Sequence, residues 1–126
     1  MPDTSDLLGV PYAPHGRSLA GMDCYGFVIE WQRRLGRTIF DFGYKPKEYK
    51  KGSEYPVWEK SMEMWKETKS PKKDDVLLFF DGKGRVVHAA NYIGGGRISH
   101  CDVQGSRVER LDGFYYRNWK AYEWRR

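Results

Sequence analysis

The 126-residue chain has few of the features that mark disulfide-bonded, secreted or membrane proteins. It holds only two cysteines, Cys24 and Cys101, so at most one disulfide could form and a disulfide framework is excluded. No apolar run approaches the roughly 20 residues of a membrane helix, and the first residues lack the basic and apolar regions of a secretory signal. We therefore expect a protein made in the cytoplasm without a signal peptide, not inserted into a membrane, with its thiols in a reduced compartment.

Internal repeats and low-complexity tracts are also missing. Lys and Arg number 22 against 17 Asp and Glu, a formal net charge of +5. This bias would attract anionic partners at long range, but it is unspecific, so we do not predict a nucleic-acid partner. Hydrophobic residues make up 40% of the chain and aromatic residues 16%. That content is sufficient for one folded domain covering residues 1–126.

Helical patterns come first along the chain and strand patterns follow. Residues 23–36 have an N-capping Asp, apolar residues at helical spacing and a terminal Gly, which predicts a helix. Residues 13–21 are rich in Gly and Pro and predict an irregular loop. Ser53 opens a second helical pattern in which Trp58, Met62 and Trp65 share a face, which indicates core packing. Strands are predicted at 76–80, 86–93, 97–101 and 107–111, and the aromatic residues after 113 are expected to close the core or an edge. The order indicates an α+β domain with an antiparallel sheet of about five strands.

Cys24 lies in the first turn of the predicted helix. Unpaired backbone N–H groups and the positive end of the helix dipole favour a thiolate there, as reactive cysteines require. The charge of Asp23 opposes this effect, unless its carboxylate caps the helix or meets a bound cation. A lone cysteine in a small domain is more often structural than catalytic, so this placement needs a nearby base.

His88 and His100 occur in adjacent predicted strands, and strand register decides whether they meet. If residues 94–96 form a three-residue loop, Ile93 pairs with Arg97, Ala90 with His100 and His88 with Asp102. The two histidines are then diagonal neighbours on one face, roughly 7–8 Å apart at the backbone. A slip of one residue would put Cys101 beside His88 instead. The first register predicts a base and a residue that orients it.

Two other uses of these residues stay open. Cys24, His88, His100 and Cys101 could form a mixed zinc site, although the short spacings of compact zinc sites are missing, so we predict no metal. A disulfide between Cys24 and Cys101 would abolish the nucleophile.

An Asp-Cys-x-Gly motif occupies Asp23-Cys24-Tyr25-Gly26. Together with residues 9–12, 16–18, 21–28, 75–80 and 88–100, this motif resembles the cell-wall cysteine peptidases of the NlpC type. Residues 37–70 have no clear counterpart and form a variable insertion, which we treat as a candidate lid. The loop at 14–18 and the ending at 111–126 look like the phage tail-associated branch.

The resemblance implies a papain-like fold in which Cys24 attacks an amide carbonyl, His88 moves the proton and His100 orients His88. It also implies that Tyr12 lies near the oxyanion and that Asp23 receives the substrate's free amino terminus. Arg17 and Tyr25 complete the expected substrate-binding residues, although Tyr25 replaces the small serine of many members. No metal or organic cofactor is expected.

These features lead us to expect a peptidoglycan hydrolase that breaks stem-peptide amides, usually between D-glutamate and a diamino acid. We expect it to be associated with phage tail proteins and to act at the cell wall. A second hypothesis is a tail assembly or plug protein with an idle site. A third is a papain-like effector that acts as a deamidase or acyltransferase.

Overall fold

The computed structural model describes residues 3–39, 64–114 and 117–125. Two short strands and one helix precede a series of longer strands. In chain order the elements are η1 (Ser5–Leu7), β1 (Arg17–Ser18), β2 (Gly21–Met22), α1 (Cys24–Arg34), β3 (Trp65–Thr68), β4 (Val76–Phe80), β5 (Val86–Gly94), β6 (Arg97–Asp102), β7 (Gly105–Arg110) and β8 (Trp119–Trp124).

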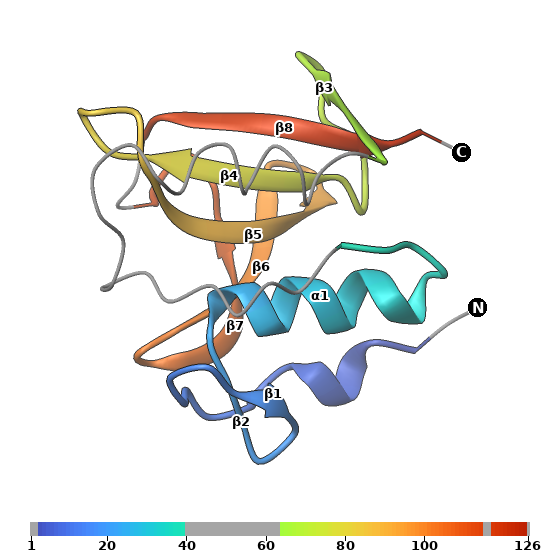
Figure 1. Cartoon of the computed structure of the whole chain (residues 1–126), viewed down its shortest axis with the longest axis vertical. Coiled ribbons are helices and arrows are strands. Elements are labelled where there is room, and N and C mark those ends of the chain that lie inside the picture. The colour runs from blue at the N-terminus through green and yellow to red at the C-terminus, as the bar shows by residue number, and fades with distance from the viewer. Residues whose placement is uncertain (1–2, 40–63, 115–116, 126) are drawn as a thin grey trace.

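The main sheet has six antiparallel strands in the order β3-β8-β4-β5-β6-β7. Helix α1 packs mainly on β5 and β6, and the small β1–β2 hairpin lies on the opposite side of the helix (Figure 1). The predicted α+β class is confirmed, with six strands where about five were expected. The described residues contain no helix long and apolar enough to cross a membrane.

Helix α1 starts at Cys24, directly after the predicted N-cap Asp23. The extended backbone of Asp23 lets its carboxylate accept a 2.7 Å hydrogen bond from the Gly26 N–H, which satisfies one of the unpaired donors of the first turn. Phe27 and Val28 are buried toward the core, as their helical spacing indicated. The chain leaves the helix at Gly36, whose φ of +78° suits a residue without Cβ.

The β5–β6 hairpin keeps the predicted register with a different turn. Asn91 pairs with Ser99 and Tyr92 with Ile98, the alignment that places Ala90 opposite His100. The expected three-residue loop is wrong, because Gly94 pairs with Arg97 and leaves a two-residue turn. A bulge before Gly94 adds to β5 the residue that the shorter turn removes, so the register beyond it is unchanged.

Two local predictions need correction. Trp65 lies in β3 and not in a helix, because Trp65↔Trp124 and the following pairs join β3 to β8. Its side chain is nevertheless buried, and its Nε1 donates to Thr38 O at 3.0 Å, so its expected place in the core is confirmed. The rest of the predicted helix, and most of the candidate lid at 37–70, lie outside the described residues. The supposedly irregular loop at 13–21 contains β1 and the start of β2.

Apolar packing occupies both faces of the sheet. Between α1 and the sheet the core includes Val28, Leu78 and Ala89. The other face buries Leu77, Phe79, Ala90, Ile98 and Phe114. Since side chains alternate along a strand, His88 and His100 share this second face with Ala90 and Ile98.

Candidate active site

Cys24 is the first residue of α1 and its side chain is buried. Burial, followed by the negative charge of Asp23, raises the pKa of the thiol to about 12. Backbone N–H groups of Ala89 and Tyr25 act in the opposite direction, by hydrogen bonding to the sulfur. The Ala89 contact places the sulfur against β5, one residue along the strand from His88.

His88 and His100 form a buried pair. Nε2 of His88 lies 3.0 Å from Nδ1 of His100, with the two rings almost perpendicular at 87°. Phe114 packs against both rings, with centroid distances of 5.5 Å to His88 and 4.8 Å to His100. Burial, and then the charge of His100, lowers the pKa of His88 to about 3. The diagonal contact expected from the strand register is present.

The Cys24 sulfur accepts from the backbone of Ala89, the residue after His88, and His88 contacts His100 directly. With His88 Nε2 engaged by His100, Nδ1 is the ring nitrogen suited to exchange a proton with a thiol. The raised thiol pKa and the lowered imidazole pKa make the resting pair neutral at pH 7. Such a pair can transfer a proton during attack on an electrophile, the arrangement of a cysteine nucleophile with a histidine base.

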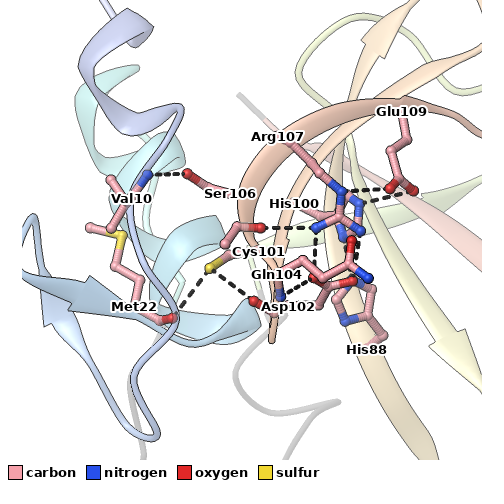
Figure 2. A network of polar contacts seen from close by, with 11 residues as sticks. Val10, Met22, His88, His100, Cys101, Asp102, Gln104, Ser106, Arg107 and Glu109 are labelled. Atoms are coloured by element: carbon pink, nitrogen blue, oxygen red, sulfur yellow. Dashed lines mark hydrogen bonds and ion pairs between the residues drawn. The ribbon is translucent and has the colours of Figure 1, made fainter.

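A charged network behind His100 was missed by the sequence reasoning. Arg107 binds both carboxylate oxygens of Asp102, at 2.6 and 2.9 Å, and its Nε donates to Glu109 Oε1 at 2.6 Å. Glu109 Oε2 in turn lies 3.3 Å from Nε2 of His100 (Figure 2). The available signal was the alternation of Arg107 and Glu109 along one predicted strand, which puts both charges on one face.

Asp23 and Arg17 form a second polar group beside Cys24. Arg17 donates through one guanidinium nitrogen to Asp23 Oδ1, at 2.8 Å, and to Gly16 O, at 2.9 Å. Asp23 is 2% exposed, and within the described part of the chain its Oδ2 has no hydrogen-bond partner. A buried carboxylate oxygen with unused acceptor capacity can take a donor from a ligand.

Tyr12 lies at the rim of this group. It pairs with Met22 through an isolated parallel bridge, and its side chain is 36% exposed. Burial, and then the negative charge of Asp23, raise the pKa of its hydroxyl, so the phenol is a neutral donor at pH 7. Among the expected binding residues, Tyr12, Arg17 and Asp23 therefore gather around the start of α1.

Tyr25 does not join them. Its side chain is 0% exposed and belongs to the core cluster between α1 and the sheet, with the Arg17 guanidinium 5.7 Å from the ring centroid. The ring is fully buried and packs beneath Arg17, and the substrate contact expected of Tyr25 stays a prediction.

The cysteines are both free, which disagrees with the disulfide alternative. The Cys101 thiol donates to Met22 O at 3.2 Å. Within residues 3–39, 64–114 and 117–125, no three His, Cys, Asp or Glu side chains gather as a metal site would require. A cavity of about 550 Å³ lies elsewhere, between the β5–β6 turn and Trp119, and none of the candidate catalytic residues lines it.

The chain is similar to proteins of a known family. The sequence model of the NlpC/P60 family matches residues 9–125. The gamma-D-glutamyl-L-lysine dipeptidyl-peptidase of Bacillus subtilis (strain 168) is 32% identical over 112 residues, covering 83% of this chain and 32% of that relative. The probable peptidoglycan endopeptidase LytE of the same strain is 30% identical over 118 residues, covering 91% and 30%. The chain spans about a third of the length of these relatives.

A solved structure shares the fold. The NlpC/P60 family protein from Bacillus cereus ATCC 10987 superposes with a TM-score of 0.65 at 26% identity, covering 93% of this chain and 36% of that one. The fold of one helix packed against a large antiparallel sheet is therefore common to both molecules.

Proposed function

The chain belongs to the NlpC/P60 family, and from that premise we propose that it hydrolyses amide bonds of peptidoglycan stem peptides through an acyl-enzyme on Cys24. The observation that carries the proposal is the contact of His88 Nε2 with His100 Nδ1, at 3.0 Å, next to Ala89, whose backbone hydrogen-bonds to the Cys24 sulfur. The two relatives, named as a dipeptidyl-peptidase and a probable peptidoglycan endopeptidase, support the class of substrate.

In the first half of the reaction, His88 Nδ1 takes the thiol proton as the Cys24 sulfur attacks the amide carbonyl carbon. The carbonyl oxygen gains negative charge, which the neutral Tyr12 hydroxyl and the backbone N–H groups at the start of α1 can stabilise. The C–N bond then breaks, and His88 returns the proton to the leaving amine. The acyl group remains on the sulfur as a thioester.

In the second half, His88 takes a proton from water while the water oxygen attacks the thioester carbonyl. Collapse of this intermediate breaks the C–S bond, releases a carboxylic acid and restores the thiol with the proton held by His88. The sequence of steps consumes one amide and one water, and it requires no metal or organic cofactor.

Substrate recognition follows from the buried acid beside the nucleophile. Oδ1 of Asp23 is occupied by Gly26 and Arg17, whereas Oδ2 has unused acceptor capacity. A free amino terminus on the substrate would supply the missing donor and a compensating positive charge. We propose that the chain cleaves stem peptides whose amino end is free, at the bond between D-glutamate and a diamino acid.

The Cys24→Ala variant tests the proposal. We expect loss of muropeptide release by at least about 1000-fold, because the variant lacks the proposed nucleophile. Mass spectrometry of products from defined stem peptides would report both the reaction and the bond. Cys101→Ser is the matched control, since a hydroxyl can still donate to Met22 O, and it should keep the activity. Release by Cys24→Ala at the wild-type rate would exclude the mechanism.

The same assay separates the competing functions. A tail plug with an idle site would release no product and would alkylate slowly at Cys24. A deamidase would release ammonia, and an acyltransferase would give an adduct with an added amine. The filled nucleophile, base and orienting positions favour hydrolysis over the idle site.

Delivery by a phage tail is a separate part of the proposal. It is supported by the likeness of residues 14–18 and 111–126 to tail-associated members of the family. Peptide mass spectrometry of purified phage particles should find the chain in the tail fraction, together with the tail proteins that hold it. Its absence from intact particles would contradict this placement.

A further inference from the structure

The carboxylate of Glu109, on β7, stands behind the histidine pair at the end away from Cys24. His100 is 0% exposed, and its Nε2 has no aligned hydrogen-bond partner in the described residues. Glu109 Oε2 lies 3.3 Å from this nitrogen, a contact that becomes an ion pair when the histidine pair is protonated (Figure 2). Glu109 therefore follows His100 in the series of candidate catalytic side chains.

The position of the proton on each histidine ring depends on its neighbours in this series of side chains. A carboxylate only accepts hydrogen bonds, so a favourable contact with Glu109 requires the proton of neutral His100 on Nε2. Nδ1 of His100 is then an acceptor, and His88 must donate to it through Nε2. His88 Nδ1 is left with a lone pair, as a base for the Cys24 thiol requires. The opposite tautomers would place a proton on His88 Nδ1 and block transfer from the thiol.

We infer that Glu109 is a positioning residue, which selects the tautomers of His100 and His88 and stabilises the imidazolium formed when Cys24 gives up its proton. This inference rests on the proposed cysteine chemistry but names a residue beyond the Cys24, His88 and His100 set. Glu109 acts through His100 and does not touch the reacting atoms.

Neighbouring charges hold Glu109 in place for this role. Arg107 Nε donates to the other carboxylate oxygen, Oε1, at 2.6 Å, while both terminal nitrogens of Arg107 bind Asp102. Among the described residues, the charged groups that act on the histidine pair are Glu109, Arg107 and Asp102. Two carboxylates against one guanidinium leave one net negative charge, which balances one imidazolium.

The first test reads the tautomers directly and needs no substrate. In ¹⁵N-labelled protein near pH 7, the ring nitrogen shifts should show His88 and His100 both protonated on Nε2, with His15 assigned by substitution. Glu109→Gln should give a mixture, because an amide can donate as well as accept. A wild-type His100 protonated on Nδ1 would overturn the inference, whatever the variants do.

The second test measures the rate at which iodoacetamide alkylates Cys24, located by peptide mass spectrometry, as a function of pH. Glu109→Gln should slow the reaction about tenfold near pH 7, which corresponds to about one pKa unit, and should converge with wild type at high pH. Glu109→Asp, which keeps the charge, should recover part of the rate. The control is Glu123→Gln, which removes a half-buried carboxylate of β8 paired with Lys72 and should match wild type.

Two outcomes of the alkylation test would contradict the inference. One is an unchanged rate in Glu109→Gln. The other is an equal slowing at every pH, which would indicate altered access to the thiol and a merely structural role. A wild-type protein that shows the expected tautomers and pH dependence but releases no muropeptides would instead refute the proposed substrate and leave the role of Glu109 intact.

Discussion

At the scale of single residues, Asp23 combines a structural and a recognition role on separate oxygens. Its Oδ1 caps α1 through Gly26 and pairs with Arg17, while its Oδ2 is buried without a hydrogen-bond partner in the described residues. A buried carboxylate is costly unless its charge and lone pairs are satisfied. The Arg17 contact offsets part of this cost, and a ligand ammonium at Oδ2 would offset more.

The Asp23→Asn variant should separate the two roles. An asparagine oxygen still accepts from the Gly26 N–H, so the helix start is preserved, but the negative charge is lost. We expect the KM for stem peptides with a free amino terminus to rise about tenfold or more, equivalent to about 1.4 kcal/mol of binding. N-acetylated substrates, poor for the wild type, should be affected far less.

Steady-state kinetics on the matched pair of substrates would measure this preference. Asp112→Asn is the control, because Asp112 is an exposed carboxylate that binds only Arg110 among the described side chains. An Asp23→Asn enzyme that kept the full preference for free amines would show that recognition lies elsewhere.

At the scale of elements, the position of Cys24 depends on how closely the start of α1 approaches the loop before β1. A Cβ built on Gly26 would lie 2.3 Å from Gly16 O and 2.9 Å from an Arg17 guanidinium nitrogen. Only a glycine permits this approach. Glycine inside a helix costs about 1 kcal/mol relative to alanine, but here it allows Arg17 to reach Asp23.

Gly26→Ala should be destabilising despite the higher helix propensity of alanine. We expect a loss of about 1–3 kcal/mol in the free energy of unfolding, as for other overpacked sites, with reduced activity because Arg17 and the helix start must move. Chemical denaturation would measure the loss. Gly82→Ala is the control, since a Cβ there meets nothing within 4 Å, and it should be close to neutral. Equal stability of the two variants would argue against the close approach.

The turn and the bulge of the β5–β6 hairpin set the position of the histidine pair. Gly95 and Gly96 have φ values of +62° and +74°, which suits the tight turn, and the bulge before Gly94 restores the alignment of the strands. A one-residue slip would turn His100 to the opposite face of the sheet. The pairing of the histidines thus depends on turn and bulge together.

At the scale of the whole molecule, the fold buries titratable groups in their neutral forms. Burial holds the pKa of His88 at about 3 and also lowers the pKa of His100, while it raises the pKa values of Cys24 and Cys101 to about 12 and 11. In the unfolded chain the histidines take up protons at a higher pH than in the folded chain, and the thiols release protons at a lower pH. Stability must therefore depend on pH at both ends of the scale.

The sign of this dependence can be stated for each group. Between pH 6.5, the ordinary value for histidine, and about 3, the unfolded chain takes up a proton that folded His88 does not, so stability falls as the pH falls. Above pH 9, the ordinary value for cysteine, the unfolded thiols ionise first, so stability falls as the pH rises. Maximum stability is expected between about pH 6.5 and 9.

Denaturation at a series of pH values would measure both arms. Below pH 6.5, His88 should contribute a slope of about 1.4 kcal/mol per pH unit. His88→Gln should remove that contribution, so the stability difference between wild type and variant should change steadily as the pH falls. Parallel acid arms in the two proteins would show that His88 is not buried in its neutral form.

Local signals in the sequence were sufficient for much of this structure. The capping Asp23 and the helical spacing that follows placed Cys24 at the start of α1, because caps and periodicity act over a few residues. Strand alternation and the turn between residues 93 and 97 brought His88 to His100, because a hairpin joins neighbours in the chain.

Contacts between distant segments were decided only by the tertiary structure. Trp65 fits a helical stripe as well as a strand, and pairing with Trp124 selected the strand. Tyr25 adjoins the nucleophile in sequence yet packs in the core, since a helix sends neighbouring side chains to different faces. The surroundings of the Asp23 carboxylate depend on the packing of the loop before β1. The contact of Glu109 with His100 depends on the packing of strand β7. Sequence periodicity sets the direction of a side chain within its own element, whereas its partner is chosen by the packing of elements far apart in the chain.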